Sequence, residues 1–120
     1  MARILVVDDE FYIRELIKKA LKTQNHSIID FDNGVDAINY IKENSIDVAI
    51  IDLVMPQKGG IETLMEIRDS NNNIKIIAIS GKIETKADAI QGLAQQFHVD
   101  KVLSKPFDVD EMIQLVEELT

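Results

Sequence analysis

The chain has 120 residues, of which 46% are hydrophobic and 28% charged, and it has no cysteine; this fits one globular domain without disulfides or thiolate metal sites. Its 21 acidic residues outnumber 13 basic ones, giving a formal net charge of -8, whereas direct nucleic-acid binders usually present a basic face. Charges appear too early for a secretory signal and no apolar run approaches the ~18 residues of a membrane span, so we expect a cytoplasmic protein that binds neither nucleic acid nor membrane.

Short apolar runs alternate along the chain with longer amphipathic stretches. We interpret the runs as strands buried on both faces, because they are mostly β-branched and lack polar alternation. The stretches between them carry apolar residues at helical spacing. In chain order, the sequence predicts a strand at 4–7, a helix over 13–21, a strand at 27–29, a helix over 35–41, a strand at 48–51, a helix over 61–67, a strand at 74–79, a helix over 87–94, a strand at 102–103 and a helix over 112–119.

Two of these helices have capping signals. Thr85 to Asp88 resembles a capping box before the fourth helix, and Asp108, with Glu111 three residues on, is placed to cap the last one. Five strands alternating with five helices predict one α/β domain over 1–120, with a parallel sheet covered on both faces. The strand order does not follow from one sequence; we adopt 2-1-3-4-5, a common doubly wound order, from known folds.

Polar residues gather where the predicted strands end. Asp8 and Asp9 follow the first strand, Asp52 ends the third, Ser80 the fourth, and Lys105 follows the fifth. In open α/β sheets, ligands bind outside the carboxyl ends of the strands where the strand order reverses, here between the first and third strands. With neighbouring strands ~4.8 Å apart, Asp52 is expected beside both the acidic pair and Ser80, and Lys105 within reach of an extended side chain.

These residue types suit phosphoryl transfer. Three crowded carboxylates repel one another unless a cation joins them, and oxygen ligands favour Mg²⁺. Asp52 is then the nucleophile that forms an aspartyl phosphate, Lys105 a compact positive charge and Ser80 a hydroxyl donor. Taken alone, each has a plainer interpretation, such as a turn residue for Asp52 or a solvated helix start for 8–10. Their conjunction at four strand ends favours the phosphoryl site.

The same residues resemble the response regulator receiver family of two-component signalling, whose fold is flavodoxin-like. The resemblance covers nearly the whole chain and is carried, in order, by ILVVDDE at 4–10, DVAIIDLVMP at 47–56, GGIE at 59–62, ISGK at 79–82 and KPF at 105–107. It implies that Asp52 accepts a phosphoryl group from a phosphohistidine on a sensor histidine kinase or a histidine phosphotransfer protein.

The resemblance also implies roles for the neighbouring residues. Asp8, Asp9 and Asp52 would hold Mg²⁺ together with the backbone carbonyl of Val54, and Ser80 and Lys105 would contact the phosphoryl group. Phosphorylation would move Ser80 and reshape the face formed by the fourth helix, the fifth strand and the fifth helix, through which a monomer or weak homodimer controls a downstream protein. The Lys105–Pro106 peptide is commonly cis in the family.

The sequence departs from the family pattern at one position. Receivers often carry an aromatic switch residue three positions before the lysine, where this chain has Val102. The output face is therefore expected to respond differently. Val54 and Lys82 stand where the family tunes dephosphorylation, and the bulk of Val54 predicts a slow or moderate decay.

Three alternatives remain open on the sequence alone. The chain is either a stand-alone receiver without an output domain or a receiver excised from a longer regulator. A haloacid-dehalogenase-like phosphatase also uses a strand-end Asp, but it normally needs a second Asp two residues later, where this chain has Val54. A scaffold that is never phosphorylated would not need Asp8, Asp9, Asp52, Ser80 and Lys105 together.

Overall fold

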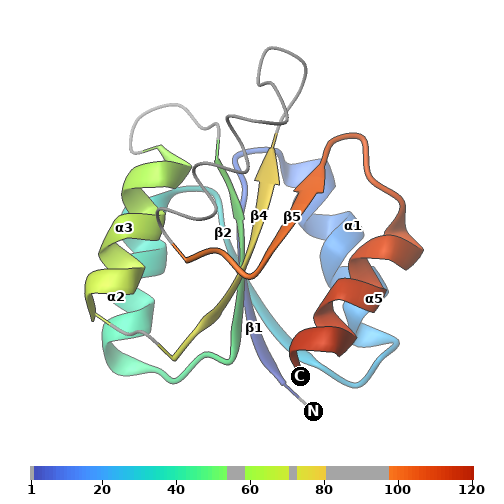
Figure 1. The fold of residues 1–120 in the computed structure, drawn as a ribbon, viewed down its shortest axis with the longest axis horizontal. Coiled ribbons are helices and arrows are strands. Elements are labelled where there is room, and N and C mark those ends of the chain that lie inside the picture. The colour runs from blue at the N-terminus through green and yellow to red at the C-terminus, as the bar shows by residue number, and fades with distance from the viewer. Residues whose placement is uncertain (1, 54–58, 71–72, 81–97) are drawn as a thin grey trace.

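The computed structural model describes residues 2–53, 59–70, 73–80 and 98–120, and it shows a parallel sheet between two layers of helices (Figure 1). The order of the five strands is β2-β1-β3-β4-β5. These strands are β1 (Arg3–Val7), β2 (Ser27–Phe31), β3 (Val48–Asp52), β4 (Lys75–Ser80) and β5 (Lys101–Ser104). The predicted α/β fold, the parallel pairing and the 2-1-3-4-5 order are confirmed.

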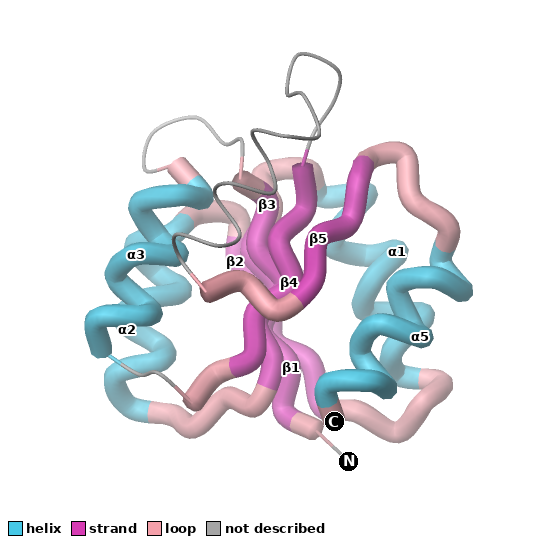
Figure 2. Tube along the Cα trace, viewed as in Figure 1, coloured by secondary structure: helices cyan, strands magenta, loops and turns pink. Residues whose placement is uncertain are grey.

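The described helices cover both faces of the sheet (Figure 2). They are α1 (Phe11–Lys22), α2 (Gly34–Glu43), α3 (Gly60–Ser70) and α5 (Val109–Leu119). Helices α2 and α3 lie on one face, and α1 and α5 on the other. The helix predicted over 87–94, with its Thr85 capping signal, lies outside the described residues. Within the described ranges, no helix has both the length and the apolarity needed to cross a membrane.

Alternate residues of each central strand bury on opposite faces. In β1, Leu5 and Val7 join the core under α2 and α3, whereas Ile4 and Val6 join the core under α1 and α5. All four side chains are fully buried. Burying such a side chain contributes roughly 1.5–3 kcal/mol. The continuous apolar runs of the sequence therefore reflect a sheet with no solvent face, as predicted.

Side-chain caps fix the starts of two helices. The Asp108 carboxylate accepts the Asp110 N–H at 2.8 Å, which confirms the predicted cap of α5. At the start of α2, Asn33 Oδ1 accepts the Asp36 N–H at 2.9 Å, a cap that was not predicted from the sequence. Each satisfies an N–H that the helix leaves unpaired.

A buried histidine ties together the two ends of the chain. His26 Nδ1 accepts the Ala2 N–H at 3.1 Å, and Nε2 lies 3.3 Å from Glu117 Oε1 in α5. Because Nδ1 is the acceptor, the neutral ring carries its proton on Nε2 and donates to Glu117. The start of β1 and the last turns of α5 are thereby joined, and the two termini lie side by side in Figure 1.

Candidate functional site

Four acidic residues meet at the carboxyl end of the sheet. One carboxylate oxygen from each lies within 4.8 Å of the others, and this acidic cluster comprises Asp8, Asp9, Glu10 and Asp52. Asp8 and Asp52 are buried, whereas Asp9 and Glu10 are exposed. The structure thus brings together the three carboxylates that the sequence analysis selected. Glu10 also belongs to this cluster, although the sequence indicated only that it lies at the start of a helix.

Asp8 is held in place by contacts with β2, with α1 and with the residue that precedes α1. Its N–H donates to the Phe31 carbonyl of β2 at 3.1 Å, and its Oδ1 accepts the Glu10 N–H at 2.8 Å. Arg14 of α1 donates from Nη1 to the Asp8 carbonyl at 2.8 Å and from Nε to Asp30 Oδ2 at 2.9 Å. These contacts fix both the backbone and one carboxylate oxygen of Asp8.

Lys105 reaches the acidic cluster from the opposite side. Its Nζ lies 2.7 Å from Glu10 Oε1 and 3.1 Å from both Asp8 Oδ2 and Asp52 Oδ2. Its N–H donates to the Ser80 carbonyl at 2.9 Å, so the residue is positioned by the end of β4. The Lys105–Pro106 peptide is cis, as the resemblance implies. The reach expected of the lysine across two strands is realised.

Two side chains of the site have raised pKa values, for different reasons. Burial and the nearby Asp52 charge raise the pKa of Asp8 to about 6, against the opposing effects of the Glu10 N–H and of Lys105. Burial alone would lower the pKa of Lys105, but its hydrogen bonds to Glu10 and Asp52 and the surrounding negative charge outweigh it and raise that pKa well above its usual value. The lysine is therefore fully charged at neutral pH.

The oxygen atoms of the cluster fit a hard divalent cation. Asp8 Oδ2 is buried and, among the described residues, has no hydrogen-bond donor; its contact with the Lys105 ammonium is an ion pair without hydrogen-bond geometry. A buried carboxylate oxygen with unmet capacity, beside further carboxylates, suits Mg²⁺. Val54, whose carbonyl is the fourth expected ligand, lies outside the described residues.

The remaining predicted site residues lie on β4 and β5. Ser80 ends β4, is almost completely buried, and donates from Oγ to Ser104 Oγ at 3.4 Å. Val102 pairs with Ala78 in the sheet and is partly buried. Lys82 lies outside the described residues. The serine hydroxyl is therefore at the predicted edge of the sheet, and no aromatic ring occupies the Val102 position.

Gly60 allows α3 to start directly against the strand that carries Asp52. A Cβ at Gly60 would collide with the Asp52 carbonyl oxygen and approach Leu53 Cα to 2.5 Å. At the neighbouring Gly59, the contact that an added Cβ would make within the described part of the chain is with the far end of the Glu62 side chain, at 3.9 Å. Of the two neighbouring glycines, Gly60 is the one at which a side chain would clash with backbone. The sequence alone does not show which of the two has this requirement.

Two exposed aromatic residues stand next to the acidic cluster. Phe11 and Tyr12 form the first turn of α1 and are 67% and 73% exposed. The Arg14 guanidinium lies 5.5 Å from the centre of the Phe11 ring. Large exposed aromatic side chains are typical of surfaces that contact other proteins. The sequence analysis did not select them, because exposure is not visible in a helical pattern.

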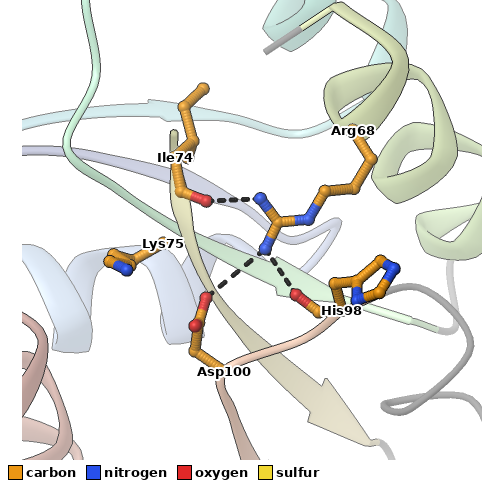
Figure 3. A pocket seen from close by; sticks show the side chains of 5 residues that line it. All are labelled: Arg68, Ile74, Lys75, His98 and Asp100. Carbon is orange, nitrogen blue, oxygen red and sulfur yellow. Dashed lines mark hydrogen bonds and ion pairs between the residues drawn. The ribbon is translucent and has the colours of Figure 1, made fainter. Parts of the chain in front are cut away.

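A pocket at the other end of the sheet has a structural explanation (Figure 3). It is lined by Arg68, Ile74, Lys75, His98 and Asp100. The Arg68 guanidinium donates to the Ile74 carbonyl at 2.6 Å and to the His98 carbonyl, and it lies 3.4 Å from Asp100 Oδ2. Its donors are thus used to clamp the end of α3 onto the starts of β4 and β5.

Comparison with known proteins gives consistent matches. The model of the response regulator receiver domain family matches residues 4–117. Regulatory protein VanR of Enterococcus faecium is 34% identical over 115 residues, covering 96% of this chain and 48% of VanR. Chemotaxis protein CheY of Bacillus subtilis is 34% identical over 117 residues, covering 95% of this chain and 93% of CheY. The chain thus spans 48% of the length of VanR and nearly all of CheY.

Solved structures give the same result. The response regulator TrrA from Thermotoga maritima, crystallised in complex with Mg²⁺ and BeF, is 33% identical and matches over 100% of both chains with a TM-score of 0.86. The receiver domain of a Francisella response regulator is 32% identical, with a TM-score of 0.86 over 99% of this chain and 96% of that one. With a family match over almost all of its length and an acidic cluster where the strand order reverses, this chain belongs to the response regulator receiver family.

Proposed function

We propose that the domain is a phosphorylation switch whose phosphoryl acceptor is Asp52. The observation that carries the proposal is the position of this carboxylate: it ends the central strand β3, is 2% exposed, and lies 3.1 Å from the Lys105 ammonium beside the other acidic residues. A buried carboxylate next to a fixed cation and a cation-binding cluster is suited to attack phosphorus and to carry the product.

The proposed reaction transfers a phosphoryl group from a histidine of a partner protein. An Asp52 carboxylate oxygen attacks phosphorus, the N–P bond breaks with its electron pair returning to the imidazole, and an acyl phosphate forms on Asp52. Mg²⁺, held by Asp8, Asp9, Asp52 and the proposed Val54 carbonyl, would neutralise the negative charge of this site. Lys105 would pair with a phosphoryl oxygen, and Ser80 would donate its hydroxyl to another.

The proposal concerns regulation rather than substrate turnover. Receivers are regulatory domains and not classical enzymes, so the family match sets the phosphatase alternative aside. The phosphodonor is a sensor histidine kinase or a histidine phosphotransfer protein in the cytoplasm. The output is a changed contact with a downstream protein through the helix predicted over 87–94, β5 and α5. Because position 102 is a valine, this change does not involve the movement of an aromatic side chain there. The proposed mechanism is the same whether the receiver acts alone or as part of a longer regulator.

Mass spectrometry after treatment with acetyl phosphate tests the acceptor. We expect one phosphoryl group on the wild-type protein, dependent on Mg²⁺, and none on Asp52→Asn, because the amide is not a competent nucleophile. Asp47→Asn is the matched control, since Asp47 precedes the same strand at its other end and its carboxylate accepts the Arg3 N–H at 2.8 Å. Phosphorylation of the Asp52→Asn protein to the wild-type level would disprove the assignment.

The exposed aromatics give a prediction about the phosphodonor. Tyr12→Ala is expected to slow transfer from a phosphorylated histidine kinase about tenfold, as loss of an aromatic contact at a protein interface typically costs 1–2 kcal/mol or more. The rate with acetyl phosphate should not change, because that small donor needs no protein surface. Met65→Ala, at a 45% exposed position on α3, is the control. Equal slowing with both donors would show that Tyr12 acts on the chemistry instead.

A further inference from the structure

Glu10 occupies a helix-capping position without acting as a cap. It is the N-cap residue of α1, with an extended backbone and no side-chain hydrogen bond to the helix. Glutamate is a poor choice at a position where Ser, Thr, Asp and Asn are preferred. Its side chain instead crosses the site to Lys105, 95 residues further along the chain, with Oε1 2.7 Å from Nζ. This Glu10–Lys105 bridge joins the loop after β1 to the loop after β5.

Of the three ion pairs that Lys105 makes with described residues, the bridge is the closest. The ammonium is 2.7 Å from Glu10 and 3.1 Å from each of Asp8 and Asp52. Before any phosphoryl group is present, the ammonium thus donates hydrogen bonds to Glu10 and Asp52 and forms an ion pair with Asp8. A phosphoryl group on Asp52 needs the same ammonium, so one of these contacts must yield. Asp8 and Asp52 are buried and fixed, whereas the Glu10 side chain is 57% exposed and able to turn into water.

We propose that Glu10 is a positioning residue that holds Lys105 over the acidic cluster in the unphosphorylated domain and competes with the phosphoryl group for it. The inference rests on the proposed function. Removing the bridge raises the free energy of the unphosphorylated state, in which Glu10 is a partner of Lys105, more than that of the phosphorylated state, in which the phosphoryl oxygens replace it. Loss of the bridge therefore favours phosphorylation.

Two substitutions separate the contact from the charge. Glu10→Gln keeps the length of the side chain but removes its negative charge. Glu10→Asp keeps the charge but is one methylene too short to keep the 2.7 Å contact with Lys105. Glu15→Gln is the matched control, since Glu15 lies on the same helix and its carboxylate pairs with Lys18 at 2.9 Å, away from the cluster. It removes the same charge without touching Lys105.

The first measurement is the affinity for beryllium fluoride, a stable mimic of the phosphoryl group, with Mg²⁺ kept saturating for each variant. We expect both Glu10→Gln and Glu10→Asp to bind it roughly two- to fivefold more tightly than wild type, because a half-exposed ion pair is worth up to about 1 kcal/mol. Glu15→Gln should match wild type. Tighter binding by Glu10→Gln alone would show simple charge repulsion and overturn the competition, as would unchanged affinity in both Glu10 variants.

A second measurement reads Lys105 without any phosphoryl mimic. In the metal-free protein, the NMR signals of the Lys105 ammonium and its ε-carbon should shift in both Glu10 variants and not in Glu15→Gln. If wild type fails to bind beryllium fluoride but these signals shift, the proposed function fails while the bridge stands. If wild type binds it and the Lys105 signals do not respond to Glu10, the bridge is disproved while the proposed function stands.

Discussion

Gly60→Ala is expected to destabilise the domain by about 3 kcal/mol or more, at the upper end of what overpacking costs. The new methyl group would collide with the Asp52 carbonyl oxygen and press on Leu53 Cα, and both are backbone atoms that no rotamer change can move. Urea denaturation at neutral pH measures the change. Since the displaced backbone belongs to Asp52, phosphorylation by acetyl phosphate should fall as well.

Gly59→Ala provides the control for this prediction. Among the described residues, an alanine there meets Glu62 Oε1 at 3.9 Å, which is an ordinary van der Waals distance. The free energy of unfolding should therefore lie within about 1 kcal/mol of wild type, because alanine also lowers the conformational entropy of the unfolded chain. Gly59 also has no positive φ that would penalise a side chain. Equal losses at Gly59 and Gly60 would show that general helix-start flexibility, and not the close approach of α3 to β3, makes the pair sensitive.

Asp8→Asn is expected to stabilise the domain at pH 7.5 by up to about 3 kcal/mol and to have little effect near pH 4. The pKa of Asp8 rises from 3.8 to about 6 on folding, mainly through burial. As the pH rises through that window, the unfolded chain releases the proton before the folded domain does, so stability falls. The amide carries no proton to release and avoids the loss. Denaturation curves at both pH values test this.

Comparison of variants at each pH isolates Asp8 from other titrating groups. Burial raises the pKa of Asp30, but the hydrogen bonds from Arg14 and Lys18 outweigh it and lower that pKa, so Asp30 stabilises less as the pH falls. Asp9→Asn is the control at an exposed position, and it should change the free energy of unfolding by less than about 0.5 kcal/mol. Mg²⁺ should raise the melting temperature of wild type more than that of Asp8→Asn. The variant lacks one carboxylate ligand and binds the ion more weakly, and a ligand stabilises a folded protein according to its affinity for it. A stability gain that is independent of pH would refute the explanation.

The sequence predicted the sheet well, because burial on both faces leaves a plain pattern. Runs such as 48–51 have no polar alternation, and each central strand sends alternate residues to opposite cores. The strand order came from known folds and not from the residues. Once that order is given, the spacing of parallel strands is enough to bring Asp8, Asp52 and Lys105 together.

The sequence could not predict which contacts these residues make. Glu10 and Lys105 are 95 residues apart, and nothing local to either predicts a bridge at 2.7 Å. The steric demand at Gly60 arises from the backbone of β3, which no pattern within 59–62 encodes. The exposure of Tyr12 depends on which way α1 turns its apolar side toward the sheet. Such features are set by the packed structure, and a helical or strand periodicity carries no information on them.

The tie made by His26 constrains how this receiver is connected to anything else. Ala2, His26 and Glu117 are joined at the amino end of β1, whereas Asp52 lies at the carboxyl end of β3. A segment attached after Thr120 therefore leaves the domain at the end remote from Asp52. An appended module would therefore leave the acceptor, at the opposite end of β3, open to a visiting kinase.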